Sequence, residues 1–123
     1  MSMFSIFNVS GSAISAQSQR LNVVASNLAN VDAVAGPDGK AYKARQVVFQ
    51  TTPIGADSAA GVRVSSIKES DAPGRKVHDP AHPLADEQGY VNHSNVNAVD
   101  EMVNMISASR SYQNNVEVMN TAK

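Results

Sequence analysis

Apolar residues at helical spacing occupy both ends of this chain, and the stretch between them holds all five prolines. Residues 1–31 contain a single charged side chain, that of Arg20, and residues 96–123 contain five. Most of the charged residues lie within residues 32–95. Because proline disrupts the interior of a helix, this distribution predicts two terminal helices separated by a loop- and strand-forming segment.

A seven-residue repeat predicts the N-terminal helix. Its members are Phe7, Ile14, Leu21 and Leu28, and Val24 and Val31 add a second row in the second half of the helix. These are the a and d positions of a coiled-coil seam. The helix is expected to end near residues 30–32, before the turn signals Gly36-Pro37 and Asp38-Gly39.

The C-terminal segment carries the clearest helical pattern. After Asn97, a good N-cap, alternating spacings of three and four connect Met102, Met105, Ser109, Tyr112, Val116 and Met119. A second apolar row, Val99, Val103 and Ile106, is confined to the first half. We therefore expect this helix to narrow from a broad buried face to a single seam.

The pattern in the middle of the chain predicts short strands and loops. Residues 43–51 and 61–69 have strand composition, and Ile67 falls out of phase with Val62 and Val64, which predicts a bulge or a strand end near Ser65-Ser66. Residues 55–61 have the composition of a hairpin connection, and residues 89–93 could add one more strand. Residues 72–83 are too rich in proline for regular structure.

The predicted fold is mainly α with a small β segment. The helices 1–31 and 96–123 form one helical domain, paired as an antiparallel coiled coil, and residues 32–95 form an outer β and loop segment. Helix pairing and subunit contact are assigned to one set of residues: Ile14, Leu21, Val24, Leu28, Val31, Met102, Met105, Ile106, Tyr112, Val116 and Met119.

The back face of the C-terminal helix is polar but almost uncharged. Ser107, Ser111, Asn114 and Asn115 stand where a solvated coiled coil would usually carry Glu or Lys. Amides and hydroxyls can be buried against a neighbour at less cost than charges. We therefore expect neighbouring subunits to cover this face. Two alternatives remain open, namely an ordinary soluble two-helix domain and terminal helices that are partly disordered in isolation.

Composition excludes several kinds of chemistry. The net charge of −1 gives no electrostatic case for nucleic acid or an acidic membrane, and the absence of cysteine excludes disulfides and thiol chemistry.

No cofactor, metal or catalytic residue is assigned. His78, Asp79 and His82 could support a small metal-dependent or hydrolytic enzyme built on residues 78–87. Pro80 and Pro83 make the helix that such a site would need unfavourable.

Two long segments resemble known signatures. Residues 12–32, "SAISAQSQRLNVVASNLANVD", resemble the N-terminal signature of the flagellar rod, hook and hook-associated family of axial proteins. Residues 89–123, beginning "GYVNHSNVNAVDEM", resemble its C-terminal signature. The resemblance extends through 42–49 and 61–86, and the short middle segment indicates a member from the proximal rod.

This resemblance implies a structural role without enzymatic activity. The resemblance implies that the chain is exported from the cytoplasm by the flagellar type III apparatus without a cleaved signal, and residues 1–16 lack a basic n-region. Members of the family polymerise in the periplasm into the shaft between the membrane ring and the hook. The implied partners are copies of the chain, other rod proteins, the adaptor that joins the rod to the ring, and the export apparatus. Neither nucleic acid nor direct membrane insertion is implied.

Overall fold

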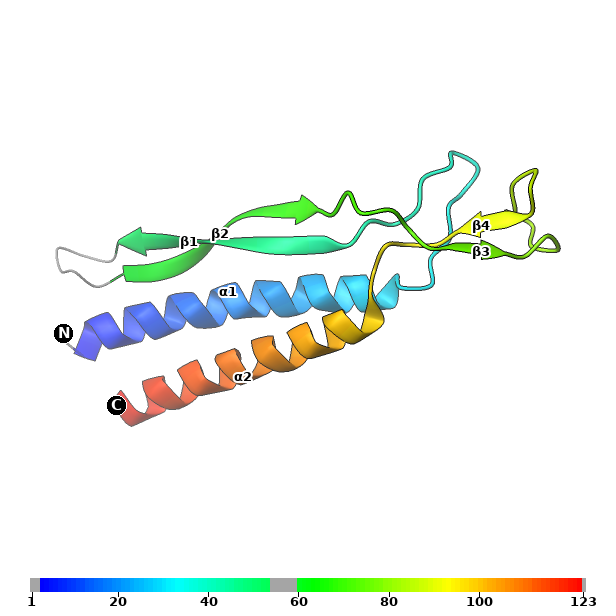
Figure 1. The fold of residues 1–123 in the computed structure, drawn as a ribbon. Coiled ribbons are helices and arrows are strands. Elements are labelled where there is room, and N and C mark those ends of the chain that lie inside the picture. The colour runs from blue at the N-terminus through cyan, green and yellow to red at the C-terminus, as the bar shows by residue number, and fades with distance from the viewer. Residues whose placement is uncertain (1–2, 54–59, 123) are drawn as a thin grey trace.

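Two long helices lie side by side and run in opposite directions (Figure 1). The computed structural model describes residues 3–53 and 60–122. Helix α1 spans Met3–Ala29 and helix α2 spans Ala98–Ala122, so both ends of the chain lie at the same end of the molecule. The strands come from the residues between the helices. The prediction of a mainly α fold with a small β segment is confirmed.

The helix ends follow the signals in the sequence. A turn over residues 30–32 terminates α1, as expected. At the start of α2, the side-chain oxygen of Asn97 accepts a hydrogen bond from the backbone N–H of Asp100 at 3.1 Å. This is the N-cap arrangement, and Asp100 and Glu101 then occupy the first turn, where the helix dipole favours acids.

Strands β1, Arg45–Pro53, and β2, Ala60–Glu69, form an antiparallel hairpin. The register shifts between Val48, which faces Ser66, and Phe49, which faces Val64, so Ser65 is the extra residue. Of the two predicted possibilities, the structure shows the bulge and not a strand end, and the bulge explains why Ile67 is out of phase with Val62 and Val64. The predicted hairpin connection at 55–61 lies mostly outside the described residues.

A second antiparallel pair consists of β3, Lys76–His78, and β4, Tyr90–Asn92. Strand β4 falls where residues 89–93 predict a strand. Strand β3 corrects the expectation that residues 72–83 contain no regular structure. The residues between Pro73 and Pro80 are free to pair, and Val77 faces Val91, whose side chain is buried.

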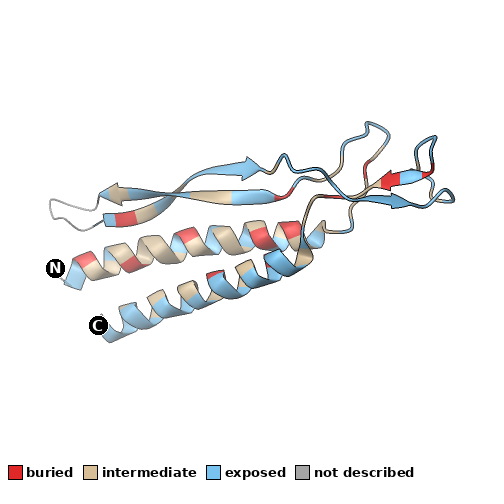
Figure 2. Cartoon of the chain, viewed as in Figure 1, coloured by how far each residue is buried: buried red, intermediate tan, exposed pale blue. Residues whose placement is uncertain are grey.

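Helix α1 is the central element of the molecule. It contacts α2 on one side and the β1–β2 hairpin on the other, while β3 and β4 extend beyond the helices (Figure 1). Figure 2 shows that buried residues are distributed along α1 and are few on α2. The buried residues of the two helices are Ser5, Ser10, Ala16, Val24, Asn27, Glu101 and Ala108.

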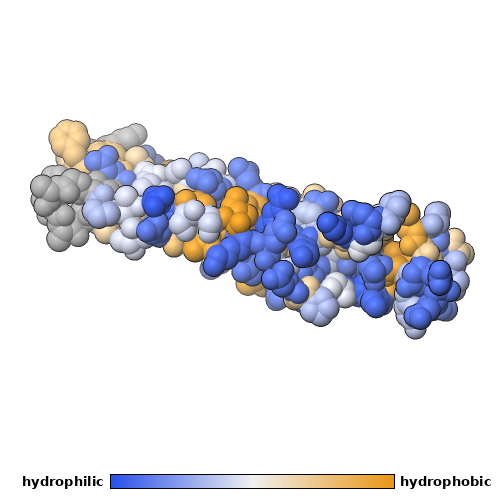
Figure 3. Space-filling model, turned by 90° about the horizontal axis from the view of Figure 1, so that it is seen from above, coloured by the Kyte–Doolittle hydropathy of each residue, from blue (hydrophilic) through white to orange (hydrophobic). Residues whose placement is uncertain are grey.

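The surface on the hairpin side is largely hydrophilic, with separate small hydrophobic patches (Figure 3). Among the described helices, none combines the length and the apolar character needed to cross a bilayer.

Candidate subunit interface

Asn27 fastens α1 to the start of β1. Its side chain is fully buried. The Nδ2 group donates to the backbone oxygen of Arg45 at 2.8 Å, and Oδ1 accepts from the Arg45 N–H at 2.9 Å and from the Tyr42 hydroxyl at 2.8 Å. A buried amide is stabilising only when it is hydrogen-bonded. These three bonds therefore set the position of β1 against α1.

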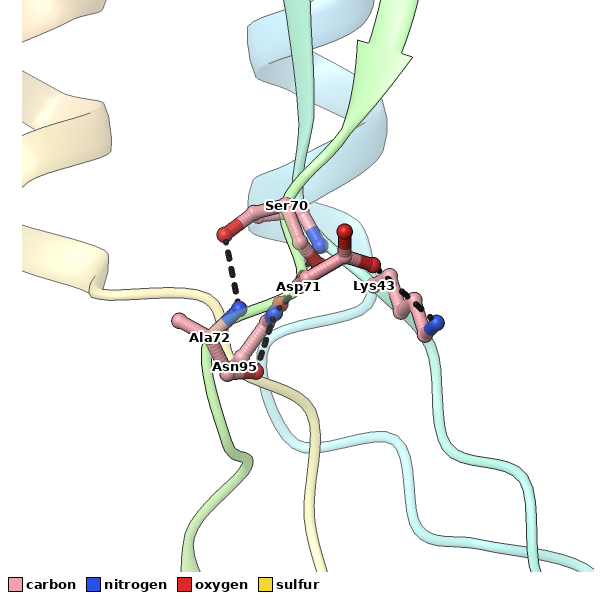
Figure 4. A network of polar contacts seen from close by, with 6 residues as sticks. Lys43, Ser70, Asp71, Ala72 and Asn95 are labelled. Carbon is pink, nitrogen blue, oxygen red and sulfur yellow. Dashed lines mark hydrogen bonds and ion pairs between the residues drawn. The ribbon is translucent and has the colours of Figure 1, made fainter.

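Asn95 joins three stretches of chain at the junction between the two hairpins. Its Oδ1 accepts from the backbone N–H of Ala44 at 2.6 Å, and its Nδ2 group donates to the backbone oxygens of Ser70 and Ala72, each at 2.9 Å (Figure 4). The ion pair between Lys43 and Asp71 lies beside this network, but both side chains are exposed, so it adds little. Asn95 thus ties the start of β1 and the end of β2 to the segment that enters α2.

Ser94 joins the segment that follows α1 to the segment that precedes α2, at the end of the helix pair opposite to the chain termini. Its hydroxyl donates to the backbone oxygen of Val31 at 2.8 Å, and its N–H donates to that of Ala33 at 3.0 Å. No role was predicted for Asn27, Ser94 or Asn95. Helix propensity does not distinguish Asn27 from Asn8 and Asn22 of the same helix.

The predicted pairing residues are only partly covered within one chain. Of these residues only Val24 is buried, and Ala16 of α1 and Ala108 of α2 are buried as well. Most of the others are half-buried, namely Ile14, Leu21, Leu28, Val31, Met105, Tyr112, Val116 and Met119. Met102 and Ile106 are exposed by 55% and 58%, so pairing within one chain does not cover them.

The first half of α2 presents an unexpected exposed face. Val99, Met102, Val103 and Ile106 are all more than half exposed, and we call them the exposed apolar row. The spacing in the sequence predicts that the row of Val99, Val103 and Ile106 is part of a broad buried face, and within one chain that prediction is wrong. Helix α2 packs on α1 through the side of Glu101 and Ala108, which leaves the opposite side open.

The uncharged back face is also accessible in the single chain. Ser107 and Asn114 are exposed, and Ser111 and Asn115 are half-buried. The Nδ2 group of Asn115 donates to the backbone oxygen of Ser111 at 2.7 Å. This amide is therefore partly satisfied within its own helix, which makes its burial against a neighbour less unfavourable.

Arg20, the only charged residue of α1, binds across the helix pair. Its Nε donates to the side-chain oxygen of Asn104 at 2.8 Å, its Nη2 donates to the same oxygen, and its Nη1 donates to Gln17 at 3.3 Å. Both partners are neutral amides. The positive charge of Arg20 is therefore held by hydrogen bonds rather than by an ion pair.

The polar groups of residues 78–87 support turns instead of forming a catalytic cluster. The Nδ1 atom of His82 accepts from the Leu84 N–H at 3.0 Å, and Asp86 accepts from the Gln88 and Tyr90 N–H groups. The ring of His78 packs edge-on against Tyr90, with ring centroids 5.0 Å apart. Among the described residues, no group of three or more His, Cys, Asp or Glu side chains is arranged to hold a metal ion.

These features define an elongated structural protein whose polar side chains hold its own backbone and whose helix α2 carries the exposed apolar row. Comparison with known proteins gives the family. Residues 7–37 match the family described as "Flagella basal body rod protein", and residues 87–123 match "Flagellar basal body rod FlgEFG protein C-terminal". The chain belongs to the flagellar basal-body rod protein family.

Full-length relatives agree with this assignment. The chain is 57% identical over 123 residues to the flagellar basal-body rod protein FlgC of Escherichia coli O6:H1. It is 56% and 58% identical to the proteins of the same name from Salmonella typhimurium and Yersinia enterocolitica. Each match covers 100% of this chain and 92% of the relative. The chain is thus a structural component of the flagellar rod and not an enzyme, and the alternative of a small hydrolase has no support.

Proposed function

We propose that this chain is a subunit of the proximal rod, the part of the flagellar shaft nearest the membrane ring. It assembles there with copies of itself and with other rod proteins, in contact with the ring and its adaptor. Its helices pair as an antiparallel coiled coil in the inner layer of a tube, and the hairpins face outward. The chain reaches the periplasm through the flagellar type III apparatus without a cleaved signal.

The exposed apolar row of α2 is the observation that carries this proposal. Four large apolar side chains at helical spacing on one open face are unusual for a protein that stays alone in water. The hairpin side, in contrast, is largely hydrophilic (Figure 3). This asymmetry supports an assembly in which α2 is covered by neighbouring subunits while the hairpins face the surroundings. The proposed coiled-coil pairing is supported by the antiparallel contact of α1 with α2.

Two isoleucines of similar exposure provide a matched test. Ile106 lies on α2 and is 58% exposed, while Ile67 lies on β2 and is 52% exposed. We expect Ile106→Glu to reduce complete basal bodies and swimming by at least tenfold, because a charge in a closed interface is desolvated without a partner. We expect Ile67→Glu to remain near the wild-type level. Basal-body counts and swimming assays on the two strains, at equal amounts of exported protein, give the comparison. Equal tolerance of both changes would contradict burial of α2 in the rod.

A further inference from the structure

A polar hollow lies where the first half of α2 passes α1 and the start of β1. Its volume is about 490 Å³, and its lining includes Arg20, Asp100, Glu101 and Asn104. Asn95 and Ser70, which appear in the network of Figure 4, also contribute to its wall. The hollow therefore sits beside the hydrogen bonds that hold the helices and the hairpin together.

Glu101 is an acid in this hollow that lacks a partner. The residue is only 9% exposed, and its Oε2 atom is buried with no hydrogen-bond partner among the described residues. Arg20 is directed to Asn104 and Gln17, and in the described part of the chain it forms no ion pair with an acid. Burying a carboxylate without a partner is strongly unfavourable. The arrangement is therefore that of a site completed by a donor from outside the chain.

The charges of the hollow indicate which kind of donor would complete it. Arg20 contributes one positive charge, and Asp100 and Glu101 contribute two negative charges, which leaves a formal charge of −1. One additional cation neutralises the site. A guanidinium suits it best, because its planar fork binds a carboxylate through two hydrogen bonds and has further N–H groups for amide and hydroxyl oxygens.

We propose that the hollow receives the side chain of Arg110 from a second copy of this chain. The inference rests on the proposed function, because it names the partner of the α2 surface within the rod. Arg110 is the only cation among residues 98–122, and it is exposed. No hydrogen bond or ion pair engages it within the described residues.

Because of the geometry of the helix, the proposed contact joins one side of α2 in one copy to the opposite side of α2 in the next copy. Arg110 follows Glu101 by nine residues, and at about 100° per residue this is two and a half turns. The donor and the acceptor thus lie on opposite sides of the helix, about 13.5 Å apart along its axis. One copy can bind a neighbour on each side, so the contact continues from copy to copy instead of closing into a symmetric pair. Neighbouring α2 helices then run parallel, offset by roughly that distance.

Chemical cross-linking of rods tests this pairing directly. We would replace the wild-type chain with the Arg110→Lys variant, isolate basal bodies and treat them with a carbodiimide, which joins a lysine amine to a carboxylate in contact with it. Mass spectrometry should find peptides in which position 110 is joined to Glu101. This product forms between copies, because the two positions lie on opposite sides of one helix. It should disappear when Glu101→Gln is added.

Three results would count against the proposal or its basis. Cross-links between copies at other lysines, without a product joining 110 to 101, would overturn it. A product that joins position 110 to another rod protein would show that Arg110 contacts that protein and not a second copy of this chain. This result would also overturn the proposal. Absence of the chain from isolated basal bodies would instead refute the proposed function itself.

A charge reversal gives a second, independent measurement. We expect Arg110→Glu to lower the number of complete basal bodies by at least tenfold, because a third acid would then enter a hollow that already holds Asp100 and Glu101. The matched control is Glu117→Lys, which also reverses an exposed charge on α2 but lies outside the hollow. This control should assemble at close to the wild-type level. Normal assembly of Arg110→Glu would refute the pairing.

Discussion

Asn27→Ala should detach the start of β1 from α1. The change removes all three hydrogen bonds of the buried amide and leaves the N–H and C=O groups of Arg45 without their partners. The hydroxyl of Tyr42 also loses Asn27, although it keeps Ser26 at 3.1 Å. An unsatisfied buried group costs about 1–3 kcal/mol. Because the Arg45 side chain is exposed and water can approach this backbone, we take the lower value, about 1 kcal/mol, for each of the two Arg45 groups. The hydrogen bond lost by Tyr42 adds about 1 kcal/mol, which gives about 3 kcal/mol in total.

Amide hydrogen exchange on the purified full-length chain measures this loss at the affected atom. The Arg45 N–H donates to Asn27, so its exchange reports the contact directly. A loss of about 3 kcal/mol corresponds to roughly 100-fold faster exchange at Arg45. Asn22→Ala serves as the control, because Asn22 is an exposed asparagine on the same helix and should change stability by no more than about 0.5 kcal/mol.

The same exchange assay can also test a variant with a smaller expected effect. Tyr42→Phe removes a single hydrogen bond, worth about 1 kcal/mol, so exchange at Arg45 should be only about fivefold faster. Equal effects of Asn27→Ala and Asn22→Ala would refute the role of Asn27. Unprotected Arg45 in the wild-type chain would show that α1 does not dock on β1 in the monomer, which would favour terminal segments that become ordered on assembly.

Two further predictions concern the helix pair and its back face. Leu21→Glu should abolish basal-body assembly and swimming, because it places a charge in the half-buried seam, whereas Leu84→Glu, at an exposed loop leucine, should be tolerated. Retained motility in the Leu21 variant would contradict the pairing. Ser111→Glu should leave expression and export intact but block rod completion, because desolvating a new charge against a neighbour costs several kcal/mol. The control is Lys68→Glu, at an exposed position of β2, and this variant should give a normal number of basal bodies. Normal basal-body numbers for both variants would show that the back face of α2 is solvated in the rod.

Local patterns predicted the elements of this fold but not the contacts that join them. The seven-residue spacing and the Asn97 cap predicted both helices, and the phase of Ile67 predicted a bulge or a strand end near Ser65, because each depends on neighbours in the sequence. Strand β3 was missed because its pairing with β4 outweighs the two prolines that flank it. Asn95 could not be recognised, since its role exists only when Ala44, Ser70 and Ala72 meet around it.

For the candidate interface too, the sequence pattern predicts the apolar face but not the contacts that this face makes. Periodicity shows that one face of a helix is apolar, but it does not show whether the cover comes from the same chain. The row of Val99, Val103 and Ile106 therefore appeared as part of a buried face in the sequence and is open in the structure. The position of Glu101 in the first turn of α2 suits the helix dipole, and only the packing of α2 on α1 shows that this residue is buried.

The pairing of α1 with α2 can begin only after most of the chain has been synthesised. Arg20 and Asn104 meet across the helices although 84 residues separate them in the chain. Synthesis at roughly 5–20 residues per second puts about 4–17 s between their appearances. Closing a loop of that length then costs about 4 kcal/mol in chain entropy. During this interval the side of α1 that packs on α2 in the finished chain lacks its cover.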